Sequence, residues 1–90
     1  MPKCIVVNKY KQDFDVYIGR GSKWGNPFPM HNSTDIERDR VCDVYEQWFW
    51  TTDLSSHLHE LKGKRLGCFC KPKRCHGDFL SQLVNQLEEE

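Results

Sequence analysis

Three short apolar segments of the chain predict β-strands. "CIVVN" at residues 4–8 is apolar and β-branched, and "VYIGR" at residues 16–20 predicts a second, shorter strand. "RLGCFC" at residues 65–70 predicts a third strand, which follows Gly63, a residue suited to end a helix. Between the second and third strands lies "GRGSKWGNPFPM", whose three glycines and two prolines in twelve residues predict a long loop.

Three other segments have apolar residues at helical spacing. Residues 32–52 predict a helix with Ser33 or Thr34 as its N-cap. The expected buried face of this helix consists of Ile36, Val41, Val44, Tyr45 and Trp48. Residues 53–64 predict a second, short helix, and its apolar side is formed by Leu54, Leu58 and Leu61. A last helix begins at Cys75 or Asp78, and its apolar positions are Phe79, Leu80, Leu83, Val84 and Leu87.

This order of elements predicts an α/β fold, because the strands are separated by helices. We expect one small domain over residues 1–87, with a short, mostly parallel or mixed sheet flanked by about three helices, as in a fragment of a Rossmann-like fold. The three glutamates at residues 88–90 predict a frayed acidic tail.

Composition narrows the range of partners and compartments. The formal net charge is zero, so nucleic acid is not the favoured partner, although six positive and no negative charges lie between Lys62 and Arg74. That basic segment predicts either a local anion site or a solvated rim. No apolar run is long enough for a membrane span or a signal peptide, so we expect a cytoplasmic protein. Five cysteines in a reducing compartment make disulfides an unfavoured explanation.

The densest chemistry lies in "RLGCFCKPKRCHGD", residues 65–78, at a strand–turn–helix junction where α/β proteins bind ligands. One interpretation is a Cys3His zinc site made by Cys68, Cys70, Cys75 and His76. The C-x-C-x4-C-H spacing differs from the usual zinc knuckle, and adjacent Cys75 and His76 are awkward as joint ligands. A purely structural alternative is that Cys68 and Cys70 are small buried hydrophobic residues of a central strand.

The other interpretation is a ligand-binding or catalytic junction. A thiol at a helix N-terminus favours its thiolate, so Cys75 is a candidate nucleophile. His76 and Asp78 are the candidate acid and base. Lys73 and Arg74, with the amides of the first helical turn, are candidate phosphate ligands.

The glycine-rich loop is the second candidate region. Its residue types together suit a nucleotide: glycines, basic residues, hydrogen-bonding side chains and an indole. The phosphate would contact the basic side chains, and the nucleobase would stack on the indole ring. The candidate ligand-binding residues are Gly19, Arg20, Ser22, Lys23, Trp24 and Asn26. The alternative is a structural loop that packs Trp24 and Phe28 into the core.

Both segments together resemble the DUF4326 family of small bacterial and phage proteins. The resemblance rests on "VYIGRGSKWGNPF" and "GKRLGCFCKPKRCHGDFL", and the second fits the pattern L-G-C-x-C-x-P-x-x-C-H-G-D. It carries no assigned activity, but it places Cys4 and Cys42 outside the motif, as candidates for packing. A more distant similarity is to DUF488-type proteins, which have a counterpart of Cys68 and none of Cys70. That difference argues against a four-ligand metal site as the ancestral use of the junction.

These observations leave three hypotheses. The first is a domain that binds a nucleotide-like or phosphorylated ligand between the glycine-rich loop and the junction, and that processes it by hydrolysis or glycosidic cleavage. The second is a zinc-stapled module that binds nucleic acid or a protein without catalysis. The third is an interaction protein or homodimer, because "WFW" at residues 48–50 places at least one large ring on an exposed helix face.

Overall fold

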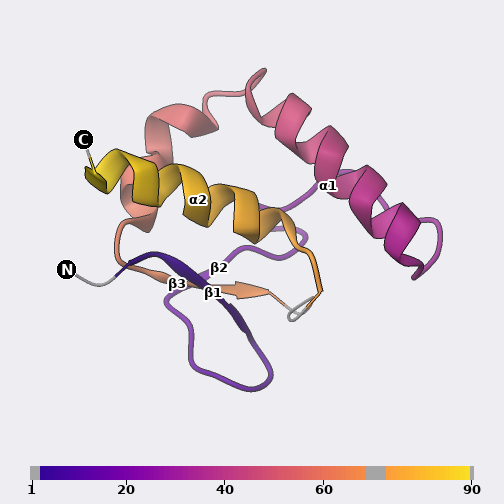
Figure 1. Cartoon of the computed structure of the whole chain (residues 1–90), viewed down its shortest axis with the longest axis horizontal. Helices are drawn as coiled ribbons and strands as arrows, with labels where there is room; N and C mark the ends of the chain where they lie inside the picture. The colour runs from indigo at the N-terminus through magenta and orange to yellow at the C-terminus, as the bar shows by residue number, and fades with distance from the viewer. Residues whose placement is uncertain (1–2, 69–72, 90) are drawn as a thin grey trace.

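The structure, a computed structural model, describes residues 3–68 and 73–89. Its sheet has the order β1-β3-β2, formed by Ile5–Asn8, Arg65–Cys68 and Val16–Tyr17, and both pairings are parallel. The predicted α/β fold with a short parallel sheet is thereby confirmed. Residues 69 and 70, expected at the end of the third strand, lie outside the described residues. Helix α2, His76–Glu89, lies across the sheet, with 3-10 helix η1, Leu54–Leu61, and helix α1, Asp35–Phe49, on the same side (Figure 1).

The segment between β1 and β2 crosses the opposite face of β3. Since β1 and β2 are parallel and lie on either side of β3, residues 9–15 must return to the amino-terminal edge of the sheet. Gly67 permits this crossing, because a Cβ at that position would lie 2.5 Å from the ring of Phe14. The crossing ends at Asp15, whose carboxylate accepts hydrogen bonds from the backbone and side chain of Arg65. This connection fixes β2 against the central strand.

The buried face of α1 differs from the predicted one. Thr34 is the N-cap, as expected, and its hydroxyl accepts from the Glu37 amide. The core, however, takes Val41, Tyr45 and Phe49, and Ile36 is 84 % exposed. Ile36 belongs to the first turn of α1, and Figure 1 shows this end of the helix at the edge of the molecule. Its predicted burial was therefore wrong, and the prediction missed Phe49.

The other helices follow their predicted apolar faces closely. Leu54, Leu58 and Leu61 of η1 are buried, and Gly63, which follows the C-cap residue Lys62, adopts a φ of 69°. In α2, Leu80 and Val84 are fully buried, Phe79 and Leu83 are half-buried, and Leu87 is exposed. Trp50 is 58 % exposed, which confirms that one ring of "WFW" faces solvent. No helix in residues 3–68 or 73–89 has the length and apolar character needed to cross a membrane.

Glu37 ties the first turn of α1 to the preceding loop. Its carboxylate accepts from Arg40 and from the His31 amide, and these contacts lower its pKa from 4.5 to about 2. A carboxyl whose pKa is lower in the folded state stabilises the fold above its unfolded pKa, and that contribution disappears as the pH falls toward the folded value. We expect Glu37→Gln to be less stable than wild type near neutral pH.

This deficit of Glu37→Gln should shrink as the pH falls from about 4.5 to about 2, where wild type loses the charged contact as well. Urea unfolding of both proteins across this range measures the difference. A constant difference between the two free energies of unfolding would show that the Glu37 charge contributes nothing.

Candidate functional site

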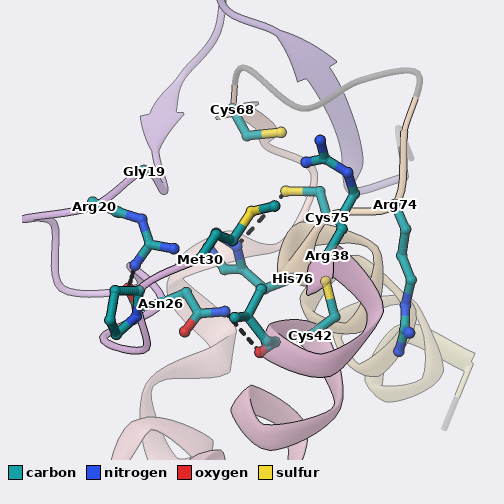
Figure 2. A pocket seen from close by; sticks show the side chains of 12 residues that line it. Gly19, Arg20, Asn26, Met30, Arg38, Cys42, Cys68, Arg74, Cys75 and His76 are labelled. Carbon is teal, nitrogen blue, oxygen red and sulfur yellow. Dashed lines mark hydrogen bonds between the residues drawn. The ribbon is translucent and has the colours of Figure 1, made fainter. Parts of the chain in front are cut away.

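A cavity of about 340 Å³ lies at the carboxyl edge of the sheet. It is bounded by the glycine-rich loop after β2, by α1, by the end of β3 and by the start of α2, so four separate segments of the chain contribute to its wall (Figure 2). The lining residues are Gly19, Arg20, Asn26, Pro29, Met30, Arg38, Val41, Cys42, Cys68, Arg74, Cys75 and His76. The two segments that the sequence singled out therefore meet at one cavity.

Cys75 forms the N-cap of α2. The Gly77 amide donates to its Sγ at 3.4 Å, and the Cys75 amide donates to the Asp78 carboxylate at 3.2 Å. This reciprocal cap resembles a capping box, with a thiol in the place of a hydroxyl and with the N2 amide of Gly77 as the donor in place of the N3 amide. Asp78, expected as an acid or base, therefore holds the first turn of α2, and it does not line the cavity.

His76 is 8 % exposed, and its tautomer follows from its hydrogen bonds. Its Nε2 lies 2.7 Å from the Ile18 carbonyl oxygen, which can only accept, so Nε2 carries the proton. Nδ1, 3.7 Å from Cys75 Sγ, is then the basic nitrogen (Figure 2). Burial lowers the pKa of His76, which favours this neutral form near pH 7.

The arginines divide into two groups. Arg40, Arg65 and Arg74 pair with carboxylates. Within the described residues, Arg20 and Arg38 have no carboxylate partner; Arg20 donates to the Asn26 carbonyl oxygen at 2.7 Å, and the Nε of Arg38 is buried with no hydrogen-bond partner. Both line the cavity, so among the residues that the structure describes the cavity wall holds two guanidinium groups that are not paired with a carboxylate.

Three predicted phosphate ligands are engaged elsewhere. Arg74 contacts the carboxylates of α1, which raise its pKa, and Figure 2 shows its guanidinium turned away from the cavity centre. Lys23 pairs with Glu60 at 2.9 Å and Lys73 with Asp35 at 3.7 Å, and neither lysine lines the cavity. These contacts indicate that the three basic side chains connect separate elements of the fold.

The glycine-rich loop is held by its own side chains. Trp24 is 3 % exposed and packs in the core, as the structural interpretation of this loop predicted. Its indole therefore presents no face to a nucleobase. Asn26 donates to the Val41 carbonyl oxygen and accepts from the Phe28 amide. The Ser22 hydroxyl donates to the Gly19 carbonyl oxygen at 2.6 Å. Of the predicted ligand-binding residues in this loop, Gly19, Arg20 and Asn26 reach the cavity.

One wall of the cavity was not predicted from the sequence. That wall consists of Pro29, Met30, Arg38, Val41 and Cys42. Arg38 is the chemically significant omission, because it supplies charge from α1. In the sequence it is indistinguishable from Arg40, and only the folded arrangement separates the paired arginine from the one that faces the cavity.

The described donors do not make up a metal site. Within residues 3–68 and 73–89, no three His, Cys, Asp or Glu side chains are placed to hold one ion, although Cys68, Cys75 and His76 all line the cavity. Cys70, the fourth ligand of the predicted zinc set, lies outside the described residues. No disulfide joins any two of Cys4, Cys42, Cys68 and Cys75.

A family model described as "Domain of unknown function (DUF4326)" matches residues 6–86. The chain belongs to the DUF4326 family. An uncharacterized 12.4 kDa protein of Enterobacteria phage T4, from the nrdA-td intergenic region, is 44% identical over 93% of this chain and 80% of its own length. An uncharacterized protein of Acanthamoeba polyphaga mimivirus is 35% identical over 91% of this chain and 75% of its own length.

No solved structure matches this DUF4326 chain significantly. The family match includes every residue that lines the cavity, from Gly19 in the glycine-rich loop to His76 in α2.

Proposed function

We propose that the cavity binds a small anionic ligand, nucleotide-like or otherwise phosphorylated. The observation that carries this proposal is the placement of Arg20 and Arg38 on the cavity wall without carboxylate partners among the described residues. Guanidinium groups bind phosphate oxygens through directed, charge-assisted hydrogen bonds. An anion between the two arginines would satisfy the buried Arg38 Nε and neutralise the wall.

The remaining wall suits the uncharged part of such a ligand. Pro29, Met30 and Val41 line the cavity, and its volume of about 340 Å³ is within the range of small-molecule sites. Methionine adapts its shape to flat or irregular groups, so Met30 is the candidate neighbour of a base or sugar. With Trp24 in the core, affinity is expected to come from the arginines and this apolar wall.

Thermal unfolding with a panel of nucleoside monophosphates and inorganic phosphate tests the proposal. We expect at least one of these compounds to raise the wild-type melting temperature. Arg38→Gln and Arg20→Gln should each weaken binding by about 10- to 100-fold, because each removes charge-assisted hydrogen bonds.

The matched control is Arg65→Gln, which removes an arginine paired with Asp15 at the opposite end of β3. This variant should retain wild-type affinity even if its stability changes. The proposal fails if no compound in the panel shifts the wild type, or if Arg65→Gln weakens binding as much as the two cavity variants do.

A further inference from the structure

Cys75 and His76 form a thiol–imidazole pair at the cavity wall. Nδ1 of His76, the basic nitrogen, lies 3.7 Å from Cys75 Sγ, and the Ile18 carbonyl fixes the ring through Nε2. The Gly77 amide donates to the same sulfur from the N-terminus of α2, where negative charge is stabilised. The sulfur thus has a proton acceptor beside it, a hydrogen-bond donor for its thiolate, and a place on the wall of the cavity.

The position of the base selects the type of reaction. In-line displacement at phosphorus expels the leaving group on the side opposite the attacking atom, where His76 cannot protonate it. Addition to a trigonal carbonyl carbon gives a tetrahedral intermediate whose leaving group departs near the attacking atom. One imidazole can then accept the proton of the nucleophile and return it to the leaving group. The adjacent Cys75 and His76 therefore suit acyl chemistry better than phosphoryl transfer.

We propose that Cys75 is the nucleophile for addition–elimination at an acyl carbon of the ligand bound in this cavity, with His76 as the proton carrier. This inference rests on the proposed function, because Arg20 and Arg38 hold the anionic end of the ligand while a separate acyl group reacts. The class of substrate is thus a small phosphorylated or otherwise anionic ester or amide.

The reaction balances without a further reactant except water. The Cys75 thiol proton moves to His76 Nδ1 as the sulfur attacks the carbonyl carbon, and the carbonyl oxygen takes the displaced electron pair. The intermediate collapses, the bond to the leaving group breaks, and that group takes the proton from Nδ1. Water then adds to the thioester, giving its proton to Nδ1, and the returning thiolate takes that proton as the carboxylic acid is released.

The test exposes the folded protein to p-nitrophenyl acetate and follows p-nitrophenolate release and the protein mass. We expect one acetyl group per chain, mapped to Cys75, with Cys42 and Cys68 of the same cavity reacting more slowly. His76→Gln retains an amide donor at the place of Nε2 and removes the base, so acetylation should slow by about 100-fold. Cys75→Ser preserves an N-cap side chain and should form no thioester.

Acetylation of Cys75 in His76→Gln as fast as in wild type would overturn the inference. If His76→Gln does not fold, the distribution of acetyl groups among the cysteines of the wild-type protein decides instead. Equal acetylation of Cys42, Cys68 and Cys75 also overturns the inference. Phosphate-dependent thermal shifts with an unreactive Cys75 would reject this inference alone. A reactive Cys75 without any anion-dependent shift would reject the proposed function and leave the thiol–imidazole pair established.

Discussion

Phe49→Ala is expected to lower the free energy of unfolding by about 4 kcal/mol. Phe49 is fully buried at the end of α1, with its ring 5.3 Å from that of Phe79 and 6.3 Å from that of Tyr45. Truncation removes the apolar transfer energy and leaves a cavity between α1 and α2. A chain of 90 residues has a total stability of about 5–13 kcal/mol, so this change removes a large part of it.

Urea unfolding measures this effect as a fall in the transition midpoint. Trp50→Ala is the matched control, because Trp50 is the adjacent aromatic residue and is 58 % exposed. It should cost about 1 kcal/mol or less. If Phe49→Ala does not fold, Phe49→Leu should still show a loss of about 1.5 kcal/mol. Equal effects of Phe49→Ala and Trp50→Ala would contradict the packing of α1 described above.

Gly25→Ala is the second substitution with a large expected effect, and it should change both the stability of the glycine-rich loop and anion binding in the cavity. A Cβ at Gly25 would lie 2.5 Å from the Gly19 carbonyl oxygen and 3.2 Å from the Arg20 Cα. Both contacts are with backbone, so no side-chain rotation relieves them. We expect a loss of about 2 kcal/mol in the free energy of unfolding. Anion binding should also weaken, because the displaced segment carries Arg20.

Ser22→Ala is the control for this prediction. It removes the hydroxyl that donates to the same Gly19 carbonyl oxygen, which still accepts from the Ser22 amide at 3.1 Å. The expected cost is about 1 kcal/mol or less, with anion binding retained. Gly25→Ala with wild-type stability and wild-type anion affinity would show that the loop does not need the close approach of Gly25 to Gly19.

The fold followed from local patterns where those patterns determined burial. The β-branched run at residues 4–8 specified a strand, and the three leucines of η1 specified the face of that helix that packs in the core. The face of α1 was harder to predict, since Ile36 and Phe49 are both apolar and both fit a helical period. The choice between them depends on where α2 crosses α1, and this tertiary information is absent from the local sequence.

The candidate site was predictable in its location and less so in its chemistry. The glycine-rich loop and the Cys–His junction meet because parallel strands bring their carboxyl ends to the same edge of the sheet. The charges could not be assigned from sequence, because Lys23 and Lys73 look as suitable as Arg38 for binding phosphate. Their carboxylate partners, Glu60 and Asp35, lie 37 and 38 positions away in the chain and become neighbours only in the fold.

A crystal structure of the protein with the nucleoside monophosphate that gives the largest thermal shift tests the central claim most directly. The claim predicts the phosphate between the guanidinium groups of Arg20 and Arg38, hydrogen-bonded to the Arg38 Nε, with the base or sugar against Met30 and Val41. A ligand bound elsewhere on the protein, or a phosphate that contacts neither arginine, would contradict it.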